Sequence, residues 1–543
     1  MPHTKAAHLD DSLDLEETLS LQSCRIDFPL GIGRWLADKC RVEFVEMNLK
    51  KRLISGFGSA LLIVFLTGCV TEPSALTGEK KSYGYTWQQE LEIGKSSDRD
   101  LVREMGLYPD DALSNYVTEI GERVLTQSNL RQPDTPEIYR DLKFTFRVMD
   151  SPVVNAFALP GGYVYVTRGL LAHLNNEAQL AVVLGHEITH VAARHASQQA
   201  LKQQWGQIGL VAGAVIGQGI TGNEHFADQF LGLGGSVFQM LTLKYGRDAE
   251  RESDIYGVEY SAKAGYEVGE SAAFFNSLGR ISGKSGQRLP TWQSSHPDPG
   301  ERESRINQLA LEMKQKYGDL KVGETEYLRR IDGLVVGENP RQGVALRGKF
   351  YHPALDFQFS VPEGWRVKNE AGRVTLVDRQ GKGVIIFSGG EGDTPEAAAR
   401  SFVASSKVQP IRSEPSRLGG SPGYVVESVV STSNGPVFMR NRFFSHSRSV
   451  FSFLSYASVE EVDIYRPAFD QVTGSFGPIQ DRAIRNLQPA RLNVVSADRE
   501  TEFDSYLSTE LPWGLENMDL AIINQVNLKD KIRKGQKLKL VSQ

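Results

Sequence analysis

The stretch Gly185-His186-Glu187-Ile188-Thr189-His190 decides how this chain of 543 residues is interpreted. Positions i and i+4 lie on one face of an α-helix, so His186 and His190 can both reach a single metal ion. Glu187 then projects beside them, toward a water molecule held by that ion. The spacing therefore predicts a helical zinc site with Glu187 as its general base.

The surroundings of the motif indicate a buried helix. Helical periodicity begins at Asn176, a residue suited to the N-cap, and continues to about Leu201. The alternative is a helix with two unconnected histidines, but burying two imidazoles and a carboxylate without partners costs on the order of several kcal/mol. A shared metal ion satisfies all three groups. The apolar residues around the motif are Leu180, Val182, Val183, Leu184, Ile188 and Val191.

A zinc site of this kind needs a third protein ligand and a position open to water. His195 lies five residues after His190 and points away from the ligand face, so we interpret it as a structural or supporting residue. Three acids follow in a helix-compatible stretch, at Glu250, Glu252 and Asp254. Glu250 and Asp254 share a helix face that excludes Glu252, which makes these two the better candidates.

Four blocks of sequence occur in a characteristic order: Asn155 to Gly162, Gly185 to His195, Glu250-x-x-x-Asp254, and Ser295-His296-Pro297 with Arg302. Together, over roughly residues 90–316, they resemble the HtpX/BepA-like family of zinc metallopeptidases, which are gluzincins. The resemblance implies an endopeptidase with one zinc ion per chain and a third ligand at Glu250. It also implies that Asp254 is an outer acceptor for His186 or His190. The sequence departs from the family at Gly246 and Ser253, where Ser and Ala are usual, and both positions lie outside the ligands.

Peptide hydrolysis also needs a group that stabilises the developing oxyanion, and His296 and Arg302 are the candidates. The resemblance places His296 on a loop near the metal, where it can instead occupy the water position and hold the enzyme latent. A third interpretation makes His296 a loop residue that caps a helix starting at Pro297.

Substrate binding is predicted at the strand that carries Asn155, Ala156, Phe157 and Ala158. In the family that the chain resembles, an edge strand near the active-site helix pairs with an extended substrate backbone, which tolerates many side chains. Unfolded or misassembled polypeptides are then preferred, because folded ones hide their strands. The alternative is an ordinary core strand.

Periodicity predicts the elements around these motifs. Helical spacing indicates two helices from Gln88 to about Ile120, and alternation indicates three strands between Leu142 and Val166. The turn signal Pro160-Gly161-Gly162 predicts that the second and third strands form an antiparallel hairpin.

The start of the chain contains a three-part export signal. Lys50 to Arg52 is basic, Leu53 to Leu66 is mostly apolar, and Leu66-Thr67-Gly68-Cys69 resembles a bacterial lipobox. A helix as long as the apolar run reaches only about 21 Å, short of the roughly 30 Å bilayer core. A permanent membrane span is therefore disfavoured. The resemblance to a lipobox implies that Cys69 carries a lipid after cleavage, and Val70 in place of Asp favours the outer membrane. The alternatives are an ordinary signal peptide or a short buried segment.

Composition limits the partners. Lys and Arg number 61 against 66 Asp and Glu, and the net charge of −5 argues against a nucleic-acid partner. The three cysteines all lie within the first 69 residues, at Cys24, Cys40 and Cys69, which excludes a disulfide framework.

Two further modules are predicted after the peptidase. Tyr351-His352-Pro353 and the stretch from Phe359 to Trp365 resemble the opening of PsbP-like α+β domains. The last segment resembles a degenerate LysM-like module, but Asp498 to Thr501 replaces the usual Gly-Asp-Thr, so peptidoglycan binding and a structural role both stay open. The predicted divisions are 1–46 as an extension upstream of the true start, 47–68 as signal peptide, 69–87 as tether, 88–325 as peptidase, 326–347 as linker, 348–480 as PsbP-like domain and 488–543 as LysM-like module.

The sequence thus predicts an α+β protein: a mainly helical gluzincin domain with a small β-sheet, a PsbP-like domain and a small LysM-like module. We expect a zinc-dependent endopeptidase of the Gram-negative periplasm, anchored by lipid to the outer membrane. It would act on unfolded or misassembled envelope proteins, with peptidoglycan and the outer-membrane assembly machinery as candidate partners. The alternative is a chaperone-like envelope scaffold or a peptidoglycan-binding protein with little proteolysis.

Overall fold

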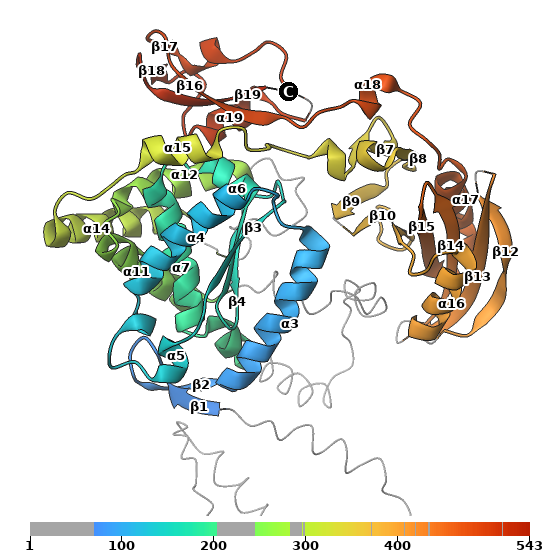
Figure 1. Ribbon diagram of the computed structural model, residues 1–543, viewed down its shortest axis with the longest axis horizontal. Helices are drawn as coiled ribbons and strands as arrows, with labels where there is room; N and C mark the ends of the chain where they lie inside the picture. Colours follow the sequence, from blue (N-terminus) through green and yellow to red (C-terminus); the bar gives the residue numbers. More distant parts are fainter. Residues whose placement is uncertain are drawn as a thin grey trace, which may run out of the picture. The chain divides into compact units, whose positions relative to one another are not determined.

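The computed structural model describes residues 70–202, 245–282, 296 and 299–542, apart from 371, 407, 419, 433–434 and 513 (Figure 1). The predicted extension 1–46, signal peptide 47–68 and lipidation site Cys69 lie outside these residues. Within them, no helix combines the length and the apolar character needed to cross a bilayer.

The peptidase region is a set of helices around one small sheet. The strands are β3 (Thr145–Met149), β4 (Ala156–Leu159) and β5 (Tyr163–Thr167), in the order β3-β5-β4. Strand β4 pairs antiparallel with β5, as the turn signal predicts, while β3 pairs parallel with β5. The helices are α3 (Trp87–Met105), α4 (Asp111–Thr126), α5 (Glu137–Arg140), α6 (Arg168–His173), α7 (Glu177–Ala192), α11 (Arg247–Lys263), α12 (Ser271–Ser282), α14 (Pro299–Tyr317) and α15 (Glu324–Ile331).

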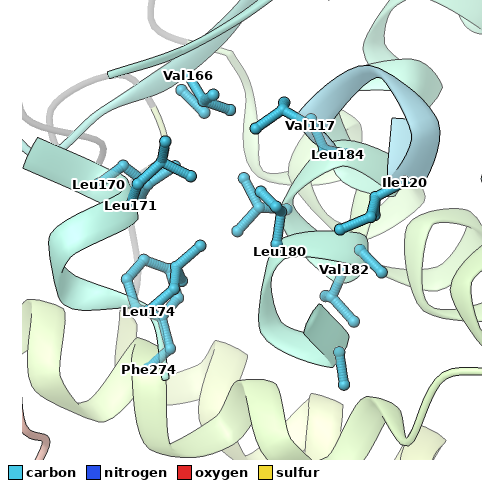
Figure 2. Close-up of a cluster of buried hydrophobic side chains, with 14 of the residues drawn as sticks. Val117, Ile120, Val166, Leu170, Leu171, Leu174, Leu180, Val182, Leu184 and Phe274 are labelled. Atoms are coloured by element: carbon cyan, nitrogen blue, oxygen red, sulfur yellow. The ribbon is translucent and has the colours of Figure 1, made fainter. Parts of the chain in front are cut away.

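The sheet separates two apolar layers. Figure 1 shows α3 on one side of the sheet and α4 and α7 on the other. Leu101 of α3 packs with Phe157 of β4 and Tyr165 of β5 in a small cluster. The opposite layer is the main core, and its side chains come from α4, β5, α6, α7 and α12 (Figure 2). The residues labelled there are Val117, Ile120, Val166, Leu170, Leu171, Leu174, Leu180, Val182, Leu184 and Phe274.

Helix α7 runs through this core. Asn176 is its N-cap, as predicted, and the Asn176 side chain accepts a hydrogen bond from the Gln179 N–H. Every residue of the helix is buried. The helix ends at Ala192 rather than near Leu201, because Arg194 adopts a left-handed backbone with φ of 59°. Residues 195–202 are helical again after this break.

The prediction that residues 69–87 form a tether is wrong for most of this segment. Strand β1 (Val70–Pro73) pairs antiparallel with β2 (Lys80–Tyr83), and α3 follows directly. The hairpin is held by Arg194, whose guanidinium forms an ion pair with Glu72 and lies 3.8 Å from the ring centre of Tyr83. A polar, Gly-containing composition suggests a flexible segment, but a buried cation elsewhere in the chain fixes this one.

The middle domain is built on a seven-stranded antiparallel sheet. Its strand order is β12-β13-β14-β15-β11-β10-β9, and helices α16 (Pro395–Ser406) and α17 (Val462–Gly474) pack on it. A second, three-stranded sheet contains β6 (Val344–Leu346), β7 (Lys349–His352) and β8 (Phe357–Ser360). The remaining strands are β9 (Arg366–Glu370), β10 (Arg373–Val377), β11 (Val384–Gly389), β12 (Pro410–Leu418), β13 (Ser421–Thr432), β14 (Gly435–His446) and β15 (Ser449–Ser458).

The C-terminal module has the predicted strand-helix-strand order. Strand β16 (Arg491–Ser496) pairs with β19 (Lys537–Ser542), and α19 (Asn517–Ile523) lies between them in sequence. Leu492, Leu520 and Leu538 of this module belong to the same apolar cluster as the core of the peptidase region. The other elements here are α18 (Arg482–Arg485), β17 (Thr501–Glu502) and β18 (Lys531–Ile532).

The predicted linker 326–347 is not a free connector. Helix α15 occupies its first part, and the Tyr327 hydroxyl donates to the Leu171 carbonyl in the peptidase core. Val335 then bridges to Arg491 of the C-terminal module, and β6 joins the sheet of the middle domain. The Gly-rich composition of this stretch concealed the contacts of Tyr327 and Val335 because both are made with distant parts of the chain.

Candidate metal centre

Four residues that offer metal-binding atoms meet in the core of the peptidase region. They are His186 and His190 from α7, Glu250 from α11, and His296, and their donor atoms all lie within 4.8 Å of one another. All four residues are buried. The three residues that the sequence predicts as ligands are therefore brought together, with the imidazole of His296 beside them.

The spacing of these atoms fits a tetrahedral zinc ion. With Zn–N and Zn–O bonds of about 2.0–2.1 Å, neighbouring donor atoms lie about 3.3 Å apart. His186 Nε2 is 3.0 Å from His190 Nε2 and 3.5 Å from a Glu250 oxygen. His190 Nε2 is 3.6 Å from the other Glu250 oxygen. Two imidazoles and one carboxylate also form a donor set that suits zinc, so the residues fit the ion.

His296 stands close to the place of a fourth ligand. Its Nδ1 lies 3.2 Å from His186 Nε2 and 2.9 Å from Glu250 Oε1. These separations resemble those among the three expected ligands. The His296 ring is also buried, which favours a role at the ligand cluster over a surface cap.

Glu187 faces the same cluster but is not one of its four potential metal ligands. Its Oε1 is buried, finds no hydrogen-bond partner among the described residues, and lies 3.6 Å from His296 Nε2. Burial raises the pKa of Glu187 above its usual value. A carboxylate in this state is suited to take up a proton, as a general base must.

Two glycines set the distance between α7 and α11. A Cβ atom on Gly185 would lie 2.6 Å from the Gly257 carbonyl oxygen, and a Cβ atom on Gly257 would lie 2.6 Å from the backbone nitrogen of His186. Only glycine allows the two helix backbones to approach this closely. The contact places Glu250 of α11 opposite the two histidines of α7.

One face of the cluster is supported by a network around Asp254. Asp254 Oδ1 lies 3.1 Å from His186 Nδ1, so the predicted outer acceptor faces His186 rather than His190. The guanidinium of Arg302 forms ion pairs with both Glu250 and Asp254, and Arg305 donates to Asp254 at 2.6 Å. Arg302 thus holds the acidic side of the site, and its alternative role as oxyanion stabiliser remains a prediction.

The other face is supported through His190. Its Nδ1 lies 2.9 Å from His195 Nδ1, and His195 Nε2 lies 2.9 Å from Glu252 Oε2. The ring of Tyr245 stacks on His190 with centres 4.1 Å apart. His195 is a supporting residue, as predicted, and Glu252 is off the ligand face, as predicted. No local pattern predicts the contact between His195 and Glu252, because it depends on how α7 and α11 pack.

The charges of the cluster follow from its burial. Burial disfavours the charged form of His186, yet the carboxylates of Asp254 and Glu250 outweigh it and raise the pKa of His186 to about 9. Burial and the charge of His186 lower the pKa of His190 well below its usual value. Burial opposes ionisation of Glu250, but His296 and His186 hold its pKa well below the usual range. A metal ion bound here needs a deprotonated ring nitrogen from each of the two histidines.

The predicted substrate strand lies beside the cluster. Strand β4 begins at Ala156, contains Phe157 and Ala158, and packs against α7. Among the described strands it pairs only with β5, so it is an edge strand. Asn155 precedes it, buried, and its carbonyl accepts from the Thr167 N–H of β5. Residues from the end of β4 and from α7 line one small cavity, among them Ala158, Leu159, Pro160, His190, Val191 and Tyr245.

The fold and the site together define a metallopeptidase-type centre: a buried helix with two histidines and a glutamate, and a third ligand from a following helix. Residues 111–310 match the model of peptidase family M48. The chain therefore contains a peptidase family M48 domain.

Named relatives share this region. The chain is 27% identical to the human mitochondrial metalloendopeptidase OMA1, over 51% of this chain and 54% of that protein. It is 30% identical to the mitochondrial metalloendopeptidase OMA1 of Arabidopsis thaliana, over 44% and 48%. It is 26% identical to the beta-barrel assembly-enhancing protease of Escherichia coli K12, over 52% and 57%. The chain thus spans about half the length of the curated relatives it matches.

Among solved structures, the chain is similar to the solution structure of cyanobacterial PsbP from Synechocystis sp. PCC 6803. The match covers 25% of this chain and 95% of that one, with 16% identity and a TM-score of 0.21. A score at this level does not establish a shared fold, and the PsbP-like assignment of 348–480 remains a prediction.

Proposed function

We propose that this protein is a zinc-dependent endopeptidase that cleaves unfolded or misassembled proteins of the cell envelope. The observation that carries the proposal is the buried cluster of His186, His190 and Glu250. The Glu187 carboxylate faces this cluster, and its Oε1 has no hydrogen-bond partner among the described residues. The M48 match and the relatives named as metalloendopeptidases support the same reaction.

The chain supplies most of the chemistry from its own residues. Zinc, when bound by His186, His190 and Glu250, supplies a Lewis acid that polarises the scissile carbonyl and lowers the pKa of water. Glu187 takes a proton from the attacking water and returns it to the leaving amine. Tetrahedral collapse then breaks the C–N bond, and Glu187 is regenerated as a carboxylate.

Strand β4 supports the choice of substrate. The edge of β4 that pairs with no other described strand offers backbone groups to an extended peptide, and backbone pairing is largely independent of side-chain sequence. Only a segment without stable structure of its own can add to such an edge. The proposed substrates are therefore unfolded chains, and the relative named as a beta-barrel assembly-enhancing protease supports a role in envelope protein quality control.

The predicted lipid anchor completes the proposal. With Cys69 lipidated, the peptidase would be held at the periplasmic face of the outer membrane of a Gram-negative bacterium, where misassembled envelope proteins accumulate. Mass spectrometry of the mature protein tests this directly, and a mature chain that begins upstream of Cys69 or lacks the lipid contradicts it.

The proposed activity is tested by incubating the zinc-loaded protein with unfolded casein, in parallel with Glu187→Gln. The substitution keeps the shape of the side chain and removes the proton acceptor. We expect cleavage by the wild type and a loss of at least about 100-fold in the variant, since general-base catalysis contributes about 10²–10⁴-fold. Equal cleavage by both proteins would exclude Glu187 as the base, and no cleavage by the zinc-loaded wild type would contradict the proposed activity.

A further inference from the structure

The second ligand of α7, His190, is connected by a continuous series of side chains to the N-terminal hairpin. His190 Nδ1 lies 2.9 Å from His195 Nδ1, and His195 Nε2 lies 2.9 Å from Glu252 Oε2. The other oxygen of Glu252 accepts from Lys81 Nζ at 3.3 Å. Lys81 lies on β2, so the series runs from the metal cluster to the hairpin.

The hydrogen-bond directions along this series are fixed by its two ends. Lys81 can only donate and Glu252 as a carboxylate can only accept, so His195 Nε2 must carry a proton toward Glu252. A neutral His195 then has a lone pair at Nδ1, which accepts from His190 Nδ1–H. This arrangement leaves the lone pair of His190 at Nε2, the atom that faces Glu250 and His186. It is the tautomer that a metal ligand requires.

The hairpin is held in register by contacts that do not involve Lys81. The Gly84 N–H donates to the Ser197 carbonyl at 3.1 Å, and the Tyr85 N–H donates to Ser197 Oγ at 3.0 Å. Glu72 on β1 pairs with Arg194, which also donates to Glu90 at 2.8 Å. These contacts bind the hairpin to the segment just after α7. They keep the ammonium of Lys81 beside Glu252.

We propose that Lys81, Glu252 and His195 form a positioning chain that fixes the tautomer and ring orientation of His190 for metal binding. The proposal rests on the proposed zinc site. It assigns to the N-terminal hairpin a role in positioning the metal ligand His190. His186 has its own support from Asp254 and Arg302 on α11 and α14. The two histidines are therefore supported from opposite sides, one from the helical interior and one from the hairpin.

The chain has an exposed end and a buried end, which allows a graded test. The side chains of Lys81 and Glu252 are 28% and 23% exposed, whereas that of His195 is 3% exposed. Lys81→Met and His195→Phe remove the first and last groups, and Lys81→Arg retains the donor. Lys80→Met is the matched control, because Lys80 is the exposed neighbour of Lys81 on the same strand.

The first readout is zinc affinity of the full chain, measured by competition with a chromophoric chelator. Loss of an outer-shell partner typically weakens metal binding by about 10–100-fold, so His195→Phe should fall in this range. Lys81→Met should weaken binding by about threefold to tenfold, because it leaves the His190–His195 contact in place. Lys81→Arg and Lys80→Met should stay within about twofold of the wild type.

The second readout separates positioning from general stability. In ¹H–¹⁵N spectra of the zinc-loaded protein, the His190 Nδ1–H resonance should be protected from solvent exchange, and Lys81→Met should increase its exchange rate. The zinc-free variants at Lys81 should unfold at the wild-type temperature. The positioning chain is wrong if Lys81→Met and Lys80→Met have the same zinc affinity and the same exchange rate of the His190 Nδ1–H resonance. It is also wrong if Lys81→Met lowers the unfolding temperature of the zinc-free protein enough to account for its loss of zinc affinity. Neither readout requires cleavage, so an inactive but zinc-binding wild type would contradict the proposed function alone.

Discussion

Arg302 brings a positive charge into the centre of the site, where both of its partners are carboxylates. It is 2% exposed, and without a metal ion it is the main cation between Glu250 and Asp254. Removing one partner of a buried ion pair is costly because the remaining charge stays buried. The stability of the zinc-free protein and its affinity for zinc are therefore linked through this residue.

Arg302→Met should destabilise the zinc-free protein by about 3–5 kcal/mol, because two buried carboxylates lose their shared cation. Zinc should restore a large part of this loss, since the ion brings its own positive charge to Glu250. The increase in melting temperature on zinc addition should thus be larger in the variant than in the wild type, which calorimetry measures. Arg305→Met is the control, because Arg305 contacts Asp254 from a position that is 21% exposed. Equal zinc-induced increases in Arg302→Met and wild type would contradict the argument.

His296 has two predicted roles at the metal centre, as a stabiliser of the oxyanion or as a group that occupies the water position, and its geometry favours the second. Its Nδ1 lies among the ligand atoms, so an imidazole in this place competes with water for the metal. We expect His296→Ala to increase casein cleavage by the zinc-loaded protein severalfold, as the latent interpretation requires. Initial rates at saturating zinc measure this. A decrease would instead support the role of oxyanion stabiliser.

At the scale of elements, the site depends on how closely α7 and α11 approach. The contact at Gly185 and Gly257 joins two backbones, so no side-chain rotation can relieve an added methyl group. The consequence reaches the chemistry, because α11 carries Glu250 while α7 carries both histidines.

Gly257→Ala should push α11 away from α7, lower the unfolding free energy by about 1–3 kcal/mol, and weaken zinc binding more than tenfold. Gly279→Ala on α12 is the control, since no described atom lies within 4 Å of the added Cβ. That change should be neutral or stabilise the helix by up to about 1 kcal/mol. Urea denaturation and zinc titration of the two variants test the contrast, and equal zinc affinities would show that the helix spacing is not critical.

The elements that the sequence predicted are those whose signal is local. Alternation between Leu142 and Val166 predicted the strands, and helical periodicity from Asn176 predicted α7, because both patterns depend only on residues close together in the chain. The break at Arg194, the β1–β2 hairpin and helix α15 were missed, because each is stabilised by partners far away in sequence. The same division holds in the site: the i, i+4 histidines and Glu250 followed from spacing and resemblance, whereas the contact of Lys81 with Glu252 spans 171 positions and leaves no local pattern.

At the scale of the molecule, the C-terminal module is joined to the peptidase region by polar contacts as well as by its apolar cluster. The Gln525 side chain donates to the His173 carbonyl at 2.8 Å. Lys539 Nζ donates to the carbonyls of Ala172 and Leu174 at 2.7 and 2.8 Å, although its side chain is buried. These carbonyls lie at the C-terminal end of α6. A module docked in this way contributes to the fold of the peptidase, whatever else it binds.

The docking lysine gives the molecule a specific dependence on pH. Burial lowers the pKa of Lys539 well below its usual value near 10.4, so between the folded and unfolded pKa the native state holds fewer protons than the unfolded chain. Stability must then rise with pH across this window and level off above about 10.4. We expect the unfolding free energy of the wild type, measured against Lys539→Met in urea from pH 7 to 10, to rise by up to about 1.4 kcal/mol per pH unit. Lys537→Met is the matched control, because Lys537 is exposed on the same strand. A constant difference for Lys539→Met would mean that this ammonium keeps its ordinary pKa, and that the carbonyls of α6 fully replace its hydration.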